Sequence, residues 1–218
     1  MRALIAVLAV LALPASAEVL NLSKGGTSAT ITLADEAASF PALAAFLRTD
    51  AEAVVSDYAD EGAARVTVRD RATYRDDRFA SILRRSEADI GGQTANVYTE
   101  GLVWDAAVED FIRLGAFFDE GEPRDEALTA LSVHVREAIR TRVWGGKVSS
   151  QYVPLVDQAT SPDLAVMSNF TILPGGGGVL FHYSPYEVAP QNKGAVEIAA
   201  PTSVFAPWLN ETGRRLFR

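Results

Sequence analysis

Cysteine is absent from this chain of 218 residues, and histidine occurs only twice. Without cysteine the protein can form neither a disulfide nor a thiol nucleophile, and it cannot carry a cysteine-linked lipid anchor. After residue 17 there is also no apolar run near the length of about 20 residues that a membrane-spanning helix requires. The sequence therefore predicts a protein that is held together by packing and is not inserted in a membrane once mature.

Basic residues are in the minority. The chain has 20 Lys and Arg against 28 Asp and Glu, and without residues 1–17 the balance is 19 against 28, a net charge of −9. Nucleic acids and anionic membranes attract proteins through clustered basic residues, so this balance argues against both partners. It favours a basic partner, although the same charge also serves solubility alone.

The first 17 residues have the pattern of a cleavable signal peptide. Arg2 supplies the positive start, an apolar run extends from Ala3 to Leu13, and Ala15-Ser16-Ala17 gives the small residues that precede a cleavage site. The run is too short for a transmembrane anchor. We expect cleavage after Ala17 and a mature protein in a bacterial periplasm or outside the cell.

Residues 18–101 alternate between strand and helix patterns. Residues 19–33 predict two short strands around Gly25-Gly26, and residues 41–62 have apolar side chains at helical spacing. Three alternating segments then follow, at 65–74, 78–90 and 95–103. They predict an antiparallel meander that has one face in solvent and one face covered by a helix.

Residues 102–210 begin with an acidic stretch and continue into the clearest helical pattern of the chain, at 123–143. Strands are predicted at 169–173, 179–183 and 195–199, and a short helix at 203–209. Together the patterns predict an α+β fold, a mainly antiparallel sheet with two longer helices packed on it. We expect one domain over residues 18–210, with parts at 18–101 and 102–210, and a basic tail at 211–218.

The C-terminal strands carry a distinctive set of residues. They include Asn169-Phe170, a glycine turn at 175–178, the segment Tyr183-Ser-Pro-Tyr186-Glu187-Val-Ala-Pro190, and Gly194. Upstream, Phe79 to Leu83, Gly91-Gly92, Asn96 and Val108 to Phe118 continue the pattern. The whole resembles the RsiV-like family of exported domains of unknown function, over about residues 79–210 and most strongly over 169–199.

The resemblance implies a domain of the cell envelope, because members include the extracellular part of a lysozyme-sensing anti-sigma factor and the non-catalytic part of some peptidoglycan deacetylases. Gln93-Thr94 stands where the family has Ala-His, so a role of that histidine does not carry over. The motif residues are expected to be structural: Gly91, Gly92, Asn96, Asn169, Phe170, Tyr183, Tyr186, Glu187, Pro190 and Gly194. For Tyr186 we expect a buried ring with a bonded hydroxyl, with direct ligand contact as the alternative.

No catalytic or metal-binding set assembles in the sequence. The pattern places His134 on or near the surface of the long helix, and alternation places His182 on a strand face towards solvent or a groove. There is no Gly-x-Ser-x-Gly elbow beside His182 and Ser184, and no short-spaced group of zinc ligands. We therefore predict no cofactor, no metal and no catalysis. An envelope hydrolase that uses His182 with Tyr186 and Glu187 is the alternative.

The acidic stretch is the expected partner surface. Its carboxylates, Asp105, Glu109, Asp110, Asp119, Glu120 and Glu122, do not have the spacing of a calcium loop, and we interpret them as a solvated face. The partner is predicted to be an unknown envelope protein or cell-wall ligand, in the sharpest form a basic, lysozyme-like muramidase. A cell-wall glycan is a third possibility, for which Trp104, Trp144 and Trp208 are the candidate contacts.

Overall fold

The structure is a computed structural model, and it describes residues 18–92 and 94–217. The predicted signal peptide, residues 1–17, lies outside the described residues, as does Gln93. Within the described part of the chain, no helix is both long and apolar enough to cross a membrane.

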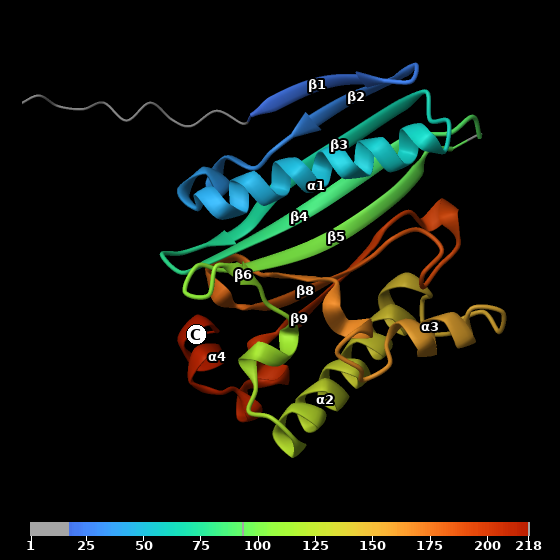
Figure 1. The fold of residues 1–218 in the computed structure, drawn as a ribbon. Coiled ribbons are helices and arrows are strands. Elements are labelled where there is room, and N and C mark those ends of the chain that lie inside the picture. The colour runs from blue at the N-terminus through green and yellow to red at the C-terminus, as the bar shows by residue number, and fades with distance from the viewer. Residues whose placement is uncertain (1–17, 93, 218) are drawn as a thin grey trace, which may run out of the picture.

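The first half of the chain builds a six-stranded, mainly antiparallel sheet (Figure 1). Its strands, in spatial as in chain order, are β1 (Val19–Lys24), β2 (Thr27–Thr32), β3 (Arg65–Arg75), β4 (Phe79–Asp89), β5 (Asn96–Asp105) and β6 (Asp110–Phe111). The predicted hairpin and the predicted meander are both confirmed by the register. The parallel pairing of β2 with β3 was not predicted, because α1 separates the two strands in the sequence.

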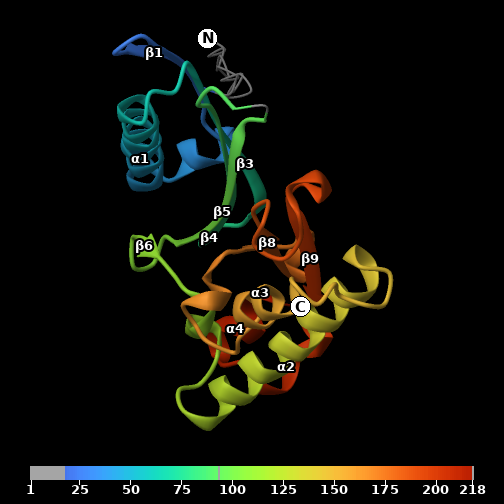
Figure 2. The ribbon, with the colours of Figure 1, turned by 90° about the vertical axis from the view of Figure 1, so that its right-hand side faces the viewer.

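Helix α1 (Pro41–Asp60) covers one face of this sheet (Figures 1 and 2). The helix begins with proline at its first position, which suits the fixed φ of that residue. It buries Leu43, Leu47, Ala51 and Val55, which follow each other at intervals of four and form one stripe. The predicted amphipathic helix is therefore confirmed, and one face of the sheet forms a core beneath it.

The second half forms a three-stranded antiparallel sheet with helices. Strands β7 (Phe170–Ile172), β8 (Gly178–Tyr183) and β9 (Val196–Pro201) pair in chain order, and α2 (Glu122–Ala138) and α3 (Val153–Ala159) lie beside them. The long helical pattern ends in a wider π-type turn at Ile139–Val143. Figure 2 shows β8 and β9 between the first sheet and α2.

The two sheets approach each other closely at β5 and β7. A Cβ added to Gly101 would lie 2.2 Å from the carbonyl oxygen of Phe170, so only glycine permits this backbone contact. The second hydrophobic core lies on the far side of β7 to β9 and includes Phe170, Phe181 and Leu131. Because β5 runs through Gly101 without a break, the expected boundary between residues 101 and 102 falls inside a strand.

The C-terminal end differs from its prediction. In place of a helix at 203–209 the chain makes two short 3-10 turns, Thr202–Val204 and Ala206–Trp208. The expected basic tail contains α4 (Glu211–Leu216), whose Leu216 is buried together with Phe217. The segment has only two adjacent apolar residues, Leu216 and Phe217, which show no helical stripe, and their burial depends on the remote side chains of the second core.

The described residues thus form a mixed fold of helices and strands, with a curled, mainly antiparallel sheet arrangement. They contain four α-helices, three of which have seven residues or more.

Candidate functional site

A cleft of about 360 Å³ lies where the edge of β5, the end of β8 and α3 meet. The residues that line it come from these three elements, from the segment between α3 and β7 and from the turn after β8: Tyr98, Leu155, Gln158, Ala159, Val166, Asn169, Phe181, His182, Tyr183 and Glu187. None of these residues is a lysine or an arginine. The cleft combines apolar side chains with the carboxylate of Glu187 and the hydroxyls of Tyr98 and Tyr183.

Asn169 closes the back of the cleft by covering the free edge of β5. Its side-chain oxygen accepts a hydrogen bond from the backbone N–H of Gly101 at 2.7 Å, and its amide nitrogen donates to the carbonyl of Thr99 at 2.9 Å. The hydroxyl of Ser184 accepts from the N–H of Thr99 at 3.1 Å. These side chains replace a neighbouring strand, because buried backbone groups need partners. The structural role expected for Asn169 matches these contacts.

Glu187 and Tyr183 supply the polar groups of the cleft. Burial raises the pKa of the half-buried Glu187, and the hydrogen bond from the backbone N–H of Ser184 at 2.9 Å opposes this shift. Burial, and then the negative charge of Glu187, raise the pKa of Tyr183, so its hydroxyl stays protonated. No side chain or backbone group among the described residues is hydrogen-bonded to that hydroxyl, which leaves it free to bind a ligand.

Tyr186 is exposed, which corrects the expectation of a buried ring. Its side chain is 57% exposed, and its backbone has a φ of +74°, in a region that non-glycine residues rarely adopt. The hydroxyl donates to Gln191 at 2.8 Å, and Gln191 donates to Thr94 at 2.6 Å. The ring points outwards because the turn reverses the chain within four residues, the N–H of Tyr186 bonding to the carbonyl of Ala189.

His182 is buried, which corrects the expectation of a position facing solvent, although it is among the residues that line the cleft. Its side chain is 1% exposed, and its Nε2 lies 2.8 Å from the hydroxyl of Thr171. Its Nδ1 lies 3.4 Å from the carboxylate of Glu197. Burial lowers the pKa of His182, and Glu197 opposes this shift. Alternation gave the correct strand face, but the second sheet turns that face towards the first.

The other aromatic and histidine candidates have structural contacts. His134 is half-buried on α2, and its Nε2 lies 3.0 Å from the carbonyl oxygen of Ala199. Trp104 is buried under α1. The half-buried Trp144 and Trp208 donate to the carbonyl of Val188 and to a carboxylate of α2, respectively.

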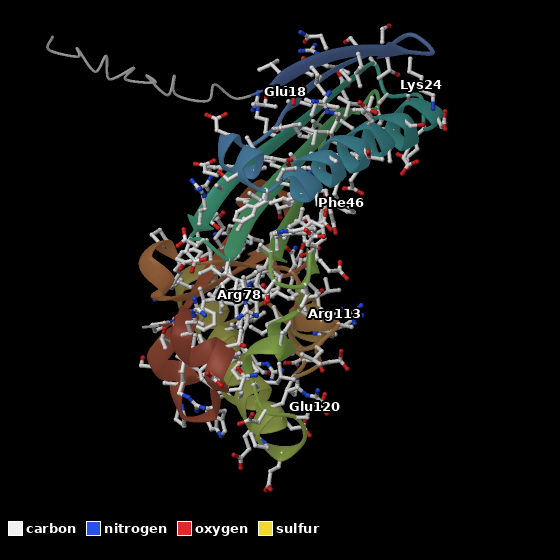
Figure 3. The ribbon with its side chains drawn as sticks, turned by 60° about the vertical axis from the view of Figure 1, so that its left-hand side comes forward. Glu18, Lys24, Phe46, Arg78, Arg113 and Glu120 are labelled. Carbon is white, nitrogen blue, oxygen red and sulfur yellow. The ribbon has the colours of Figure 1, made fainter. Side chains whose placement is uncertain are left out.

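The predicted acidic surface is divided by the fold. Asp105 is 3% exposed and accepts two hydrogen bonds from the guanidinium of Arg78, at 2.8 and 2.6 Å, which corrects its assignment to a solvated face. Burial opposes ionisation there, but the bonds from Arg78 and from the N–H of Ala107 hold the pKa of Asp105 below its ordinary value. The remaining carboxylates are exposed: Glu109, Asp110, Asp119, Glu120 and Glu122. Arg113 and Arg124 line the same hollow as Asp119 and Glu120, so this side has mixed charge; Arg113 and Glu120 are labelled in Figure 3.

The remaining motif residues lie in turns that meet near the cleft. Gly91 and Gly92 are exposed residues that follow β4, Asn96 is the first residue of β5, and Pro190 and Gly194 flank the 3-10 turn before β9. The bond between Gln191 and Thr94 joins these two connections. The fold thus brings the two separated halves of the motif together. No group of three His, Asp or Glu side chains in the described residues is arranged to hold a metal ion.

A buried ionic cluster under α1 was missed in the sequence. The side chain of Arg84 on β4 is 1% exposed and donates from Nε and Nη2 to the carboxylate of Asp70 on β3, both at 2.7 Å. It also pairs with Asp50 on α1 and donates to the carbonyl of Leu47 at 2.8 Å. The available signal was that Asp70 and Arg84 occupy positions in the alternation that otherwise hold buried apolar residues.

Comparison with known proteins bears on the second half of the chain. Residues 116–203 match the sequence profile of a family described as "Protein of unknown function (DUF3298)". This segment is a DUF3298 domain. It holds α2, α3 and the second sheet, and therefore most of the cleft, whereas Tyr98 and the rest of the first sheet precede it.

Two solved structures share the fold beyond the DUF3298 domain. A DUF3298 family protein from Pseudomonas aeruginosa PAO1 is 14% identical, with a TM-score of 0.60 over 92% of this chain and 96% of that one. A DUF3298 family member from Bacteroides fragilis NCTC 9343 is 15% identical, with a TM-score of 0.56 over 90% and 93%. No curated protein matches the chain. At these identities the likeness concerns the fold, and the first sheet is included in it.

Proposed function

We propose that this protein is an exported binding module of the bacterial cell envelope that performs no catalysis and binds a basic protein. The proposed binding surface is the Tyr186 turn together with the adjoining cleft. The observation that carries the proposal is an exposed tyrosine in an unfavourable backbone conformation next to a cleft that holds the carboxylate of Glu187.

The exposed tyrosine supports a role in contact with a partner. A non-glycine residue at positive φ costs about 1–3 kcal/mol, and such strain persists at sites where it serves a function. Tyrosine is enriched among the residues that dominate protein interfaces, because it offers a rigid apolar ring with a polar end. Tyr186 is held in position by its bond to Gln191, so little side-chain freedom is lost on binding.

The cleft supports a basic ligand group. Glu187 is the only carboxylate residue among the lining residues, and no lysine or arginine lines the cleft. The walls from Leu155 and Ala159 suit the aliphatic part of a lysine or arginine side chain, and the free hydroxyl of Tyr183 can accept a hydrogen bond from its charged end. The net charge of −9 after signal cleavage would attract a basic protein over a longer range.

The contacts of both ring nitrogens of His182 argue against the hydrolase alternative. A general base must reach the substrate, but both ring nitrogens of His182 face other side chains, Thr171 and Glu197, within 3.4 Å. The resemblance to RsiV-like domains, which include a lysozyme sensor, makes a lysozyme-like muramidase the first partner to test. The signal peptide predicted at residues 1–17 would bring the protein into the compartment in which such a partner acts.

The test is isothermal titration of residues 18–218 with a lysozyme-type muramidase at low and at high salt. We expect binding at low salt that weakens as salt is added, because charge contributes to it. Tyr186→Ala should weaken binding by tenfold or more, as expected for a central interface tyrosine. Val133→Ala, at an exposed apolar position on the outer side of α2, is the matched control and should bind as the parent does.

The acidic part of the proposal has its own variant pair. Glu187→Gln keeps the acceptor for the Ser184 N–H but removes the charge, and it should weaken binding and reduce its dependence on salt. Glu52→Gln, on the exposed side of α1, makes the same change of net charge away from the cleft and should have little effect. Absence of binding at low salt, or equal effects of the two substitutions, would contradict the proposal.

A further inference from the structure

The uncovered face of the first sheet carries a cluster of arginines in an otherwise acidic protein. On β3, Arg65, Arg69 and Arg71 are separated by even numbers of residues, so their side chains lie on one face. Val66, Val68 and Asp70 alternate with them and are buried on the α1 side. Arg85 on β4 lies directly opposite Arg69 in the antiparallel register and shares this face. We call these four residues the arginine face.

Two carboxylates of β4 share this face, Glu87 and Asp89, which lie opposite Thr67 and Arg65 in the register, so four arginines stand against two acidic residues. Arg65, Arg69 and Arg71 are exposed, and no carboxylate among the described residues lies within salt-bridge distance of them. Arg85 alone has a partner, Glu87, with 2.6 Å between Nε and Oε1. Like charges placed directly opposite each other across two strands destabilise a sheet, so the pairing of Arg69 with Arg85 is a cost. A bound anion would remove that cost.

Hydroxyl and amide groups extend the arginine face across the neighbouring strands. Thr67 of β3 lies beside Thr30 of β2, and the hydroxyl of Thr30 is 3.2 Å from the side-chain oxygen of Asn21 on β1. These half-buried or exposed groups share the face of the arginines, because register partners point to the same side. The surface thus offers guanidinium forks for acidic groups and short polar side chains for neutral hydroxyls.

The second sheet stands on the same face, beyond the arginines. The hydroxyl of Ser81, which shares the face with Arg85, accepts a hydrogen bond from the backbone N–H of Ile172 on β7 at 2.8 Å. Figure 2 shows α1 on one side of the first sheet and the second sheet towards the other. The arginine face and the second sheet therefore form a step, in which the arginine face is the lower level and the second sheet the upper one. The arginine face is about 20 Å long from Arg65 to Arg71, at a rise of about 3.3 Å per residue.

We propose that the arginine face binds a linear acidic polysaccharide through its carboxylate groups. Arginine binds carboxylates through two parallel hydrogen bonds, and the threonine and asparagine side chains between the strands bind sugar hydroxyls. A strip of about 20 Å accommodates several sugar units along β3. This site is separate from the Tyr186 turn and the cleft, and it assigns a second ligand of opposite charge to the protein.

The shape of the step favours a chain-like ligand over a membrane. A flat bilayer that rested on the second sheet could not reach arginines at the foot of the step, whereas a flexible chain can lie along it. A nucleic acid duplex has two strands of phosphates, which extend beyond a strip of this size. Anionic vesicles and duplex DNA are therefore the alternatives that the experiment must separate.

The experiment measures binding of residues 18–218 to polygalacturonate, with neutral dextran, anionic phosphatidylglycerol vesicles and duplex DNA as parallel probes. We expect binding to polygalacturonate that falls steeply with added salt, and no binding to dextran. The triple variant Arg65→Gln, Arg69→Gln and Arg71→Gln should lose at least tenfold in affinity. A triple change of exposed basic residues elsewhere, Arg113→Gln, Arg142→Gln and Lys147→Gln, alters the net charge equally and should retain binding.

Thermal unfolding of each variant separates a loss of folding from a loss of binding. The lysine version of the first triple variant keeps the charge but lacks the planar forks, and it should bind between the parent and the glutamine version. Failure of the parent protein to bind polygalacturonate at low salt would overturn the proposal. Equal loss in the two glutamine variants, or binding confined to vesicles or to DNA, would overturn it as well.

Discussion

Replacement of Arg84 by methionine tests the ionic cluster under α1. The substitution keeps an apolar stem of similar shape but removes the guanidinium, and it leaves the carboxylate of Asp70 fully buried and without its counter-charge. Asp50 pairs with the same arginine, but its side chain is 38% exposed and water can solvate it. The penalty should therefore arise mainly from Asp70.

The expected loss in the free energy of unfolding is about 3–5 kcal/mol, as for other buried pairs that lose one partner. The contacts support the upper part of this range, because two hydrogen bonds of 2.7 Å join the pair and a third, of 2.8 Å, reaches the backbone of α1. Charges about 4 Å apart attract each other by about 4 kcal/mol at an effective dielectric constant of about 20. Domains are commonly stable by about 5–15 kcal/mol, so the loss is large but measurable.

The assay is urea unfolding at pH 7, followed by far-UV circular dichroism. A double variant, Arg84→Met with Asp70→Leu, removes both charges and should recover most of the loss, since apolar replacements of buried pairs are often neutral or stabilising. A loss of less than about 1 kcal/mol for Arg84→Met would refute the reasoning, as would a double variant that is no more stable than the single one.

Three further predictions concern the sheet contact and two carboxylates. Gly101→Ala should lower the melting temperature and cost about 1–3 kcal/mol in the free energy of unfolding, because the new Cβ would lie 2.2 Å from a carbonyl oxygen of β7. In the control Gly92→Ala the nearest neighbour of the Cβ lies at 3.5 Å, so the free energy of unfolding should change by less than about 1 kcal/mol. Equal melting temperatures of the two variants would contradict this reasoning. The hydrogen bonds from Arg78 and from the N–H of Ala107 lower the pKa of Asp105 against the effect of burial. The ionised carboxylate therefore stabilises the fold above its unfolded pKa of about 3.9, and this contribution is lost as the pH falls through the lower folded pKa. In Asp105→Asn the free energy of unfolding should therefore decrease less steeply on acidification than in the parent protein. Burial raises the pKa of Glu187, so the free energy of unfolding should decrease as the pH rises from the pKa of the unfolded state through the raised pKa of the folded state. If Glu187→Gln shows a decrease of equal size over the same pH range, this carboxylate is not the cause of the decrease.

Much of the local structure could be predicted because it follows from periodicity. Apolar residues at intervals of three and four place α1 and the body of α2, and alternation places β3, β4 and β5. Alternation also predicts which side chains share a face, and it correctly assigned His182 to the face opposite Phe181. These properties depend on residues close together in the chain, so the sequence specifies them directly.

The candidate site could be predicted only in part. The motif around Asn169, Tyr183 and Glu187 was recognised, but its position beside Tyr98 and α3 depends on tertiary contacts such as that of Asn169 with Thr99, 70 positions away. The exposure of Tyr186 follows from the positive φ of this residue in a tight turn. The sequence Pro185-Tyr186-Glu187 does not predict that conformation, because it contains no glycine.

The sequence by itself determined the helical and strand segments, the faces of each strand and the excess of negative charge. Only the tertiary structure decided which of those faces is covered. The first sheet covers the face of β8 that holds His182, Asp105 is buried in its salt bridge with Arg78, and α1 covers the face that holds Arg84 while the arginine face stays open. The physical reason is that burial results from packing between elements far apart in the chain, and a local pattern contains no record of which elements meet.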